Sequence, residues 1–378
     1  MNIVKTIGKN IKTQMEKRGV SNRELAKAVG VSHPTLKRYI DGTQPIDSEK
    51  LMKVSRFFGL PFESFFKRES QSTLNFMFRA DKANENVKDV DLATLSQSIK
   101  SYLDVMENQD YYTIPAKYAI TVKDRKTLSS QVKNRIESIA YTQRKSLGIE
   151  NVVPENYFDV FTRLGINTIV RKFNNTEFFG MSSYSEDFGS FIIVNDDESI
   201  PEERKIFSLV HEFGHLLFHR SQYAEANEDV FYVSGRSDIN EKVANKFAGY
   251  FLLPRDQVEE YVNGKENVDV YKMKKHFKVS LQSLAVMLRE YKMISQEVSN
   301  NFWRTLNANK LKKEEPVPME PLSFEQKNRR LIEKIKNDYL KGEITPNKVT
   351  EILGLNVVET RKLFKKWKDS DERYIHLK

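Results

Sequence analysis

Residues 207–219 read Phe-Ser-Leu-Val-His-Glu-Phe-Gly-His-Leu-Leu-Phe-His and include the sequence His-Glu-x-x-His. On an α-helix, residues four apart lie one above the other on the same face. His211 and His215 would therefore direct both imidazoles at one Zn²⁺, and Glu212 beside them would be free to take a proton from a metal-bound water. The pattern predicts a helix that carries two metal ligands and a general base.

The apolar residues of this helix form a stripe that lies roughly opposite the two histidines. The stripe consists of Ile206, Leu209, Val210, Phe213 and Leu217. This arrangement predicts a helix that is buried on one side and presents the histidines on the other. A surface helix with two hydrogen-bonded histidines is the alternative. The chain has only six histidines, so the motif would arise by chance in about one such chain in a hundred.

A catalytic zinc needs a third protein ligand and one open position. The main candidate is Glu241, which a capping box with Asp238 would place in the first turn of a second helix. The alternative is that Glu241 only caps that helix. Asp229, Glu228 and His219 are chemically possible rivals. His219 lies two turns from His211, too far to complete a tetrahedron easily, so we expect it to support a ligand or to pack beside it.

Several blocks in order resemble the ImmA/IrrE metallopeptidases over about residues 150–300. The blocks are Asn195 with Pro201, residues 211–219, residues 241–248 (Glu-Lys-Val-Ala-Asn-Lys-Phe-Ala) and residues 252–254 (Leu-Leu-Pro). The resemblance implies zinc held by His211, His215 and Glu241, with Glu212 as general base. It also implies a protein substrate, typically a helix-turn-helix repressor that is cut in response to damage or mobile-element signals.

The composition limits the other possibilities. The 378 residues suffice for two or three domains, and the absence of cysteine excludes disulfides, thiolate metal ligands and cysteine nucleophiles. No run of about 18 apolar residues is present, and the N-terminus lacks the apolar core of a signal peptide. We therefore expect a cytoplasmic protein with no membrane partner. Two imidazoles and a carboxylate do not decide between Zn²⁺ and Mn²⁺.

The net charge of +9 is distributed unevenly. Residues 1–70 hold 14 basic and 7 acidic side chains, and residues 301–378 hold 18 and 12, which leaves 29 and 33 for the middle. A basic head and tail around a slightly acidic centre suggests a polyanionic partner at the two ends of the chain. A solubilising surface rich in lysine is the alternative.

Residues 1–68 have the pattern of a small five-helix unit. Ser21 and Glu24 form a capping box, Gly30 ends a short helix, and Ser32 caps the next one. Two short helices across a glycine-containing turn are typical of the helix-turn-helix motif. The stretch 25–42, Leu-Ala-Lys-Ala-Val-Gly-Val-Ser-His-Pro-Thr-Leu-Lys-Arg-Tyr-Ile-Asp-Gly, resembles the XRE (lambda-repressor-like) DNA-binding family.

This second resemblance implies that the helix from Ser32 enters the major groove of double-stranded DNA, while Asn22 and Arg23 approach phosphate. His33, Thr35, Lys37 and Arg38 can donate to base edges or phosphates. The candidate DNA contacts are Asn22, Arg23, Ser32, His33, Thr35, Lys37, Arg38 and Tyr39. The alternative is a module that binds protein, such as another helix-turn-helix domain, and a homodimer is possible.

The remaining segments are assigned by their periodicity. Residues 69–150 read as a helical connector docked on the peptidase, with a strand or docking segment at 74–79. Residues 151–305 form the peptidase domain, with β-rich runs at 166–170, 179–184 and 190–194 in a small antiparallel sheet. The acidic loop 195–198 is read as a solvated turn. A helical pair near 279–291 belongs to the peptidase and is not counted as a DNA reader.

A linker is expected at 306–322, followed at 323–378 by a basic helical tail that could bind DNA, a partner helix or the peptidase. The predicted fold class is α+β, mostly α, with a zincin-like centre. The predicted function is a DNA-binding regulator joined to a zinc endopeptidase. The alternatives are a non-catalytic repressor whose zinc domain only senses or binds, and a toxin–antitoxin component. A second oxyanion donor is expected, with Tyr184, Tyr232 and His219 as candidates.

Overall fold

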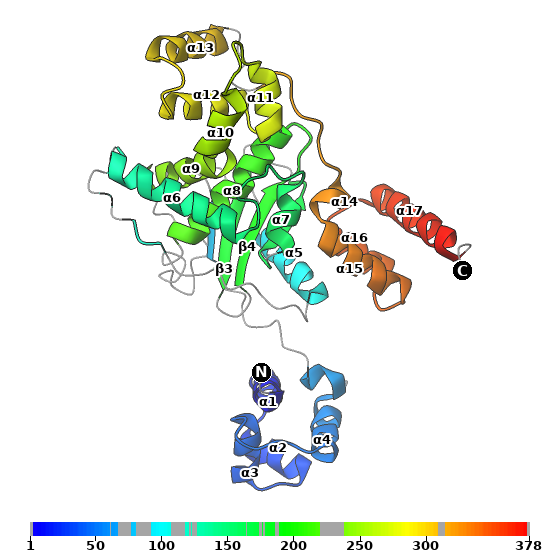
Figure 1. The fold of residues 1–378 in the computed structure, drawn as a ribbon. Helices are drawn as coiled ribbons and strands as arrows, with labels where there is room; N and C mark the ends of the chain where they lie inside the picture. The colour runs from blue at the N-terminus through cyan, green and yellow to red at the C-terminus, as the bar shows by residue number, and fades with distance from the viewer. Residues whose placement is uncertain are drawn as a thin grey trace. The chain divides into compact units, whose positions relative to one another are not determined.

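The structure is a computed structural model that divides into two compact units, Met1–Leu74 and Asn75–Lys378 (Figure 1). It describes residues 3–60, 62–66, 77–80, 92–106, 118–120, 122, 127–163, 165–173, 176, 178–185, 189–219, 238–308 and 314–375. Among these residues, no helix is both long enough and apolar enough to cross a membrane. The predicted fold class, mostly helical with a small sheet, is confirmed.

The first unit contains four α-helices and a 3₁₀ helix around one core. They are α1 (Ile3–Arg18), α2 (Asn22–Val29), α3 (His33–Ile40), α4 (Ser48–Phe58) and η1 (Phe62–Phe65). The fifth expected helix is therefore a single 3₁₀ turn. The centre of the core is almost inaccessible to solvent, with Ile11, Leu25, Leu36 and Val54 at most 1% exposed.

The α2–α3 turn forms as the sequence predicts. Ser21 caps α2 by accepting a hydrogen bond from the backbone N–H of Glu24, and Ser32 caps α3 in the same way through Thr35. Gly30 ends α2 in the left-handed region with φ of 76°, a conformation that costs other residues a steric penalty.

The second unit is built on a four-stranded sheet. Its strands, β1 (Met77–Ala80), β2 (Asn167–Arg171), β3 (Gly180–Ser185) and β4 (Gly189–Asn195), lie in the order β1-β3-β4-β2. The β1–β3 and β3–β4 pairs are antiparallel, but β2 is parallel to β4. The expectation of a wholly antiparallel sheet is therefore wrong for β2. β2 pairs with the edge of β4 that β3 leaves open, so the chain crosses over β4 between β2 and β3, and β2 runs antiparallel to β3.

Helices α8 (Glu202–Phe218) and α9 (Asp238–Leu252) form the next layer. Helix α8 packs on β3 and β4 on one side and on α9 on the other. Helix α6 (Ser130–Ser146), from the expected connector, packs on α9, and its Ile136, Ile139 and Ala140 join the common core. The remaining helices are α5 (Leu92–Val105), α7 (Tyr157–Arg163), α10 (Arg255–Val262), α11 (Val270–Phe277), α12 (Leu281–Glu290) and α13 (Gln296–Ala308).

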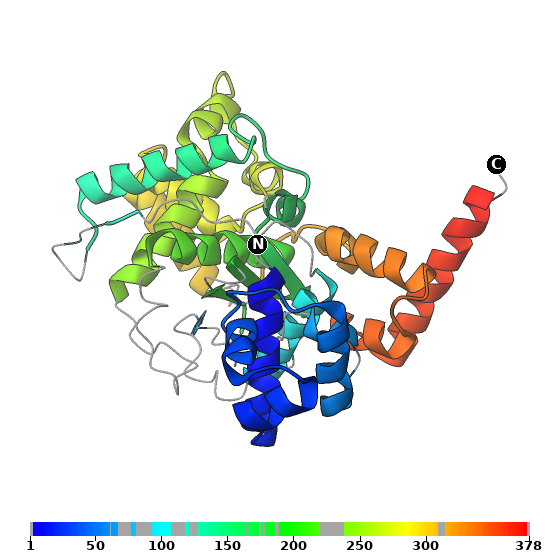
Figure 2. The same ribbon diagram turned by 90° about the horizontal axis from the view of Figure 1, so that it is seen from below.

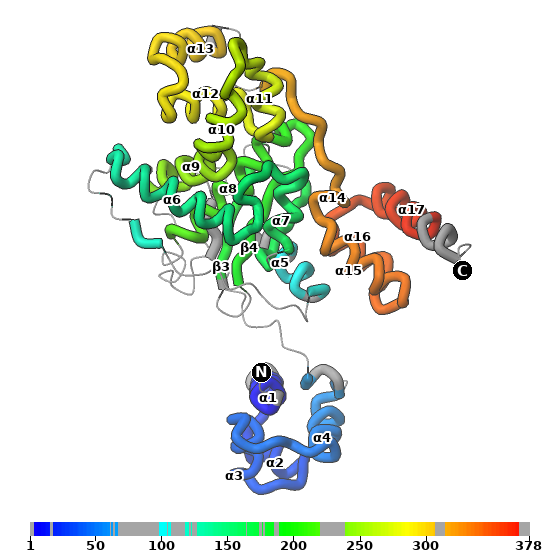
Figure 3. The backbone as a smooth tube through the Cα atoms, in the orientation of Figure 1, coloured from blue at the N-terminus to red at the C-terminus, as the bar shows by residue number. Residues whose placement is uncertain are grey.

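The C-terminal region is docked on this unit rather than extended from it (Figures 1 and 3). It comprises α14 (Phe324–Lys327), α15 (Arg329–Leu340), α16 (Pro346–Leu353) and α17 (Val357–Ile375), of which α14 and α15 contact α7 and α15 and α16 contact α5. The side chain of Asn328 pairs with edge strand β2 like a short strand. Its amide donates to the Val170 carbonyl at 2.9 Å and its oxygen accepts from the Val170 N–H at 3.2 Å.

Buried ion pairs also fix the C-terminal region. Lys327 Nζ lies 2.6 Å from Asp196 Oδ1 and 2.7 Å from Glu202 Oε2, and its side chain is 1% exposed. Lys205 contacts the same Asp196 oxygen at 2.7 Å. The solvated turn expected at residues 195–198 is therefore wrong for Asp196, which is buried because two lysines neutralise it.

Candidate metal centre

Helix α8 holds the two histidines of the motif in the interior of the second unit. His211, Glu212 and His215 are 2%, 1% and 1% exposed. The expectation of a helix buried on only one side is therefore wrong, because the sheet covers one face of α8 and α9 covers another. Buried polar side chains need partners, so the neighbours of these three residues define what the site can do.

Three side chains meet at the α8–α9 contact. His211 Nε2 lies 3.0 Å from His215 Nε2, and the two Glu241 carboxylate oxygens lie 3.4 Å from these nitrogens, one on each. Within the described part of the chain, these are the residues whose donor atoms are grouped closely enough to hold a metal ion, all within 4.8 Å of one another. The structure thus brings together the three predicted ligands. Two imidazoles and one carboxylate without thiolate are a donor set that zinc accepts.

Close packing of α8 on α9 explains why Glu241 reaches the histidines. A Cβ atom added to Gly214 would lie 3.0 Å from the Phe247 ring and 3.4 Å from Ala244 Cα. The two helices can therefore approach closely only because residues 214 and 244 are small. Glu241 lies in the first turn of α9 as expected, and Asp238 is the first helical residue. The carboxylate of Glu241 faces the histidines of α8.

Glu212 points toward the sheet and not toward α9. The Ser182 hydroxyl on β3 donates a hydrogen bond to Glu212 Oε2, and both side chains are buried. Gly180 lies close to the same site, since a Cβ at that position would lie 3.2 Å from the Ile193 carbonyl oxygen and in van der Waals contact with Glu212 Cγ at 3.6 Å. Sequence analysis missed Ser182. The only sequence signal was its place two residues after a glycine in a strand shortly before the metal-binding motif.

His219 contacts a candidate ligand and does not join the donor cluster. Its Nδ1 lies 2.9 Å from Nδ1 of His215, so one of the two rings donates to the other. If His215 is the donor, its Nε2 is left unprotonated and directed at the cluster. This position agrees with the supporting role expected for His219. Tyr184 is half-buried on β3, while Tyr232, Asp229 and Glu228 lie outside the described residues.

Two family models match the chain in separate segments. Residues 161–289 match the IrrE N-terminal-like domain, a peptidase family, and residues 11–65 match the helix-turn-helix family. The chain joins a helix-turn-helix domain to an IrrE N-terminal-like domain. This confirms the fusion that the sequence motifs predicted.

The other comparisons add little. No curated protein matches the chain. A solved structure of PlcR from Bacillus thuringiensis, in complex with a peptide and DNA, is similar at 10% identity over 99% of this chain and 97% of that chain. Its TM-score is 0.18, which carries no argument about fold or function.

A groove in the IrrE-like domain begins beside the cluster of His211, His215 and Glu241. Phe207 stacks on His211 with ring centroids 6.1 Å apart, and Phe207 also lines a cavity of about 490 Å³ together with Lys242 and Lys246 of α9. This cavity shares Lys133 and Trp303 with a second one of about 690 Å³. Both cavities are lined by residues of α6, α9, α12 and α13.

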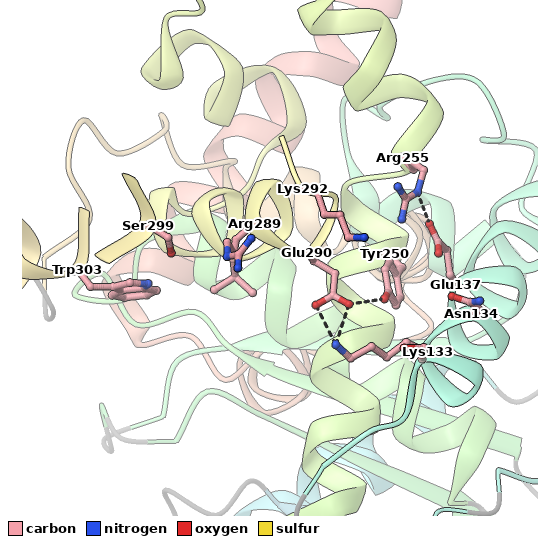
Figure 4. A pocket seen from close by; sticks show the side chains of 12 residues that line it. Lys133, Asn134, Glu137, Tyr250, Arg255, Arg289, Glu290, Lys292, Ser299 and Trp303 are labelled. Carbon is pink, nitrogen blue, oxygen red and sulfur yellow. Dashed lines mark hydrogen bonds and ion pairs between the residues drawn. The ribbon is translucent and has the colours of Figure 1, made fainter. Parts of the chain in front are cut away.

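The second cavity of the IrrE-like domain is lined by charged side chains (Figure 4). Glu290 lies 3.0 Å from Lys133 Nζ and 2.8 Å from Lys246 Nζ, and Tyr250 donates to it. Burial alone would raise the pKa of Glu290, but the hydrogen bonds and charges of Lys246 and Lys133 outweigh it and lower this pKa. Sequence analysis missed the groove because its walls come from four helices that are distant in sequence.

The helix-turn-helix domain exposes most of its candidate DNA contacts. Among the eight, the exposed side chains are Asn22, Arg23, Ser32, His33, Lys37 and Arg38. Thr35 is half-buried, and its hydroxyl lies 2.8 Å from the Ser32 hydroxyl. Tyr39 is 5% exposed and belongs to the core. The structure gives no support to the DNA contact expected of Tyr39, because its side chain packs in the core and is not exposed at the surface.

Proposed function

We propose that this chain is a DNA-binding regulator with a zinc-dependent endopeptidase that cleaves a helix-turn-helix repressor or an antitoxin-like protein in a stress or mobile-element response. The helix-turn-helix domain and the IrrE-like domain support the two halves of the proposal. The observation that carries the catalytic half is the cluster of His211, His215 and Glu241 with Glu212 held beside it by Ser182.

His211, His215 and Glu241 would hold the metal, and zinc fits their donor set. When bound there, zinc supplies a Lewis acid that polarises the scissile carbonyl and makes water more acidic. Glu212 is the general base in this proposal: it takes a proton from the attacking water and returns it to the leaving amine. Ser182 is a positioning residue, because its hydrogen bond to one carboxylate oxygen orients the other.

The groove beside Phe207 would receive the substrate. It starts next to His211 and continues past Lys242 and Lys246 toward α12. An apolar wall with basic side chains suits an amphipathic substrate segment that carries acidic residues. The exposed cations of α3, Lys37 and Arg38, would hold the chain on double-stranded DNA, where a repressor substrate also sits.

Metal analysis and a cleavage assay together test the proposal. We expect one zinc per purified chain by mass spectrometry, and much less in the Glu241→Ala variant. Glu212→Gln should keep zinc and DNA binding but lose cleavage of a candidate repressor. Cleavage that survives in Glu212→Gln would contradict the assignment of the base. Degradation of casein at a rate comparable to that of the repressor would contradict the proposed specificity.

The Glu212→Gln variant also distinguishes a peptidase from a non-catalytic repressor whose zinc domain only senses or binds. If the chain only senses metal, Glu212→Gln should leave the regulation of its target promoter unchanged. If proteolysis is the output, this variant should behave in cells like a deletion of the peptidase while still occupying DNA. A manganese-loaded chain that cleaves faster than the zinc-loaded one would replace zinc in the proposal and leave the residue roles intact.

A further inference from the structure

One helix–turn–helix arrangement occurs at three places in the described part of the chain. In α2–α3, α11–α12 and α16–α17, an eight-residue first helix ends at a residue in the left-handed region. These residues are Gly30, Lys278 and Gly354, with φ of 76°, 56° and 62°. Two positions later, a polar residue caps the second helix. The three caps are Ser32, Ser280 and Asn356.

The α16–α17 turn follows α2–α3 position by position. Leu355 takes the place of Val31 in the turn, and both are half-buried. Four residues after each cap, a side chain points inward: Leu36 is 0% exposed and Thr360 is 3% exposed. Asn356 and Glu359 cap each other, since each side chain accepts from the backbone N–H of the other.

The three helix–turn–helix arrangements differ in the residues that the second helix exposes to solvent. In α12, Leu281, Leu284 and Ala285 are buried. Val286 is exposed, but it is an uncharged, apolar residue. In α3, His33, Lys37 and Arg38 are exposed. At the matching places, α17 exposes Val357, Arg361 and Lys362, and Lys365 follows one turn later. Only α3 and α17 therefore offer a basic helix surface after this turn.

Apolar side chains on one side of helix α17 pack against the rest of the unit, and the basic side chains lie on another side of the helix. Leu363 and Trp367 are buried, and Phe364 stacks on Tyr339 of α15 with ring centroids 4.3 Å apart. In both views α17 projects away from the body of the second unit (Figures 1 and 2). The basic side chains of α17 at positions 361, 362, 365 and 368 are exposed to solvent.

The charge on the face favours a polyanion. The first twelve residues of α17, 357–368, contain five basic side chains and one acidic one, a net +4, and the last seven, 369–375, add three acidic side chains and one basic one. The acidic residue, Glu359, is used in the cap of α17, and Lys366 pairs with Glu325 at 2.8 Å. The remaining cations, Arg361, Lys362, Lys365 and Lys368, are exposed. Beside them, Val357 and Val358 are 59% and 61% exposed.

We propose that α16–α17 is a second reader of double-stranded DNA, separate from the N-terminal domain. Helix α17 enters the major groove, with Arg361, Lys362 and Lys365 on phosphates or guanine edges. Val357 and Val358, at the first positions of the helix, fit the methyl groups of thymine. This assignment goes beyond the proposed function, which uses only α3 for DNA. A single chain would then hold two DNA segments.

The test compares four full-length variants, of which the first two remove three positive charges each. The first variant is Arg361→Ala with Lys362→Ala and Lys365→Ala. The matched control, Lys265→Ala with Lys272→Ala and Lys275→Ala, removes three exposed lysines near α11 in the same unit. A third variant, Lys37→Ala with Arg38→Ala, weakens the N-terminal domain, and a fourth combines it with the α17 triple. The probe is a pool of random-sequence 30-base-pair duplexes, measured by fluorescence anisotropy over a salt series.

We expect the α17 triple to weaken binding at least about tenfold at low salt and to reduce the salt slope by up to about 2.7, or 0.9 for each lost phosphate contact. The α11 control should change neither quantity appreciably. The Lys37/Arg38 variant should keep residual binding that the combined variant loses. A triple indistinguishable from the α11 control in affinity and slope would overturn the proposal. Unchanged circular dichroism verifies that each variant is folded.

Discussion

The side chain of Glu212 is oriented by a contact with the sheet. Its neighbours on α8, His211 and His215, face Glu241, while Glu212 itself turns toward β3 and receives the Ser182 hydroxyl. A carboxylate that bound metal would face the other donors. One that accepts an orienting hydrogen bond and lies next to the donors is placed as a base. The roles proposed for Glu212 and Glu241 rest on the directions in which their carboxylates point.

We predict that Ser182→Ala lowers the rate constant of cleavage by about 10-fold and leaves zinc content unchanged. The loss arises because Glu212 keeps its charge but not its orientation. Ser182→Thr retains the hydroxyl and should recover part of the rate. Steady-state kinetics on the repressor substrate measure both variants. Equal loss in the alanine and threonine variants would indicate a packing role for Ser182.

Glu290 gives a pH-dependent prediction. Its pKa is lowered from 4.5 in the folded state, so its contribution to stability is fully present above about pH 4.5 and is lost as the pH falls through the folded value. Glu290→Gln should destabilise the chain by about 1–2 kcal/mol at pH 7. The difference between wild type and variant should shrink below pH 4.5. Urea unfolding at pH 7 and at pH 4 measures it, and a constant difference would contradict the assigned ion pairs.

At the level of elements, the spacing of α8 and α9 sets the donor geometry. The phenylalanines on this contact pack edge to face, with Phe213 and Phe247 centroids 5.8 Å apart. Gly214 and Ala244 let the helix backbones approach between these rings. The histidines and Glu241 come from different helices, so any outward shift of α9 separates the donors.

Gly214→Ala should therefore weaken metal binding without touching a ligand. The new methyl group would lie 3.0 Å from the Phe247 ring, which must move. We expect a loss of about 1–3 kcal/mol of stability and a clear loss of zinc affinity in a chelator competition. Gly264→Ala, at an exposed position with φ of 71° and no neighbour within 4 Å, is a stability control at a distance from the site. Unchanged zinc affinity in Gly214→Ala would mean that the helix spacing does not set the site.

Sequence reasoning succeeded where a local pattern determines the structure. The spacing of His211 and His215 and the Ser21, Gly30 and Ser32 signals act within a few residues, and the structure contains both arrangements. It failed where distant segments meet. The parallel pairing of β2, the Ser182 contact and the groove at Glu290 each depend on segments from different parts of the chain. The hydrophobic periodicity of a sequence does not show which distant segments come into contact. Tyr39 shows the same limit, because one helical position separates a buried side chain from an exposed one.

At the level of the whole molecule, buried charges join the C-terminal region to the start of α8. Lys327 contacts Asp196 and Glu202 from one side. Lys274 of α11 contacts Glu203 and Glu315 from the other, each at 2.7 Å. Burial raises the pKa of Glu202, and Lys327 opposes this rise. The first turn of the helix that bears the histidines is thus neutralised by lysines far along the chain.

Removal of Lys327 should destabilise the contact between the C-terminal region and the start of α8. Lys327→Met keeps most of the side-chain volume but leaves Asp196 and Glu202 with less positive charge, which should cost about 3–5 kcal/mol. Adding Glu202→Gln should recover part of the loss, because fewer buried charges then remain. Lys334→Ala, which removes a partly exposed i,i+4 pair with Asp338, should change stability by less than about 1 kcal/mol. Thermal unfolding of the four proteins measures these differences, and a silent Lys327→Met would contradict the coupling.

The same ion pairs have a consequence for the order of events during synthesis. The residues of the metal cluster are complete once Glu241 has been made, but Lys327 follows 86 residues later. At about 5–20 residues per second, a ribosome needs roughly 4–17 s to add that stretch. During this interval the acidic first turn of α8 lacks one of its neutralising lysines. We expect α8 to reach its full stability only after Lys327 has been made, and a chain terminated before Lys327 would leave Asp196 and Glu202 without one of their neutralising lysines.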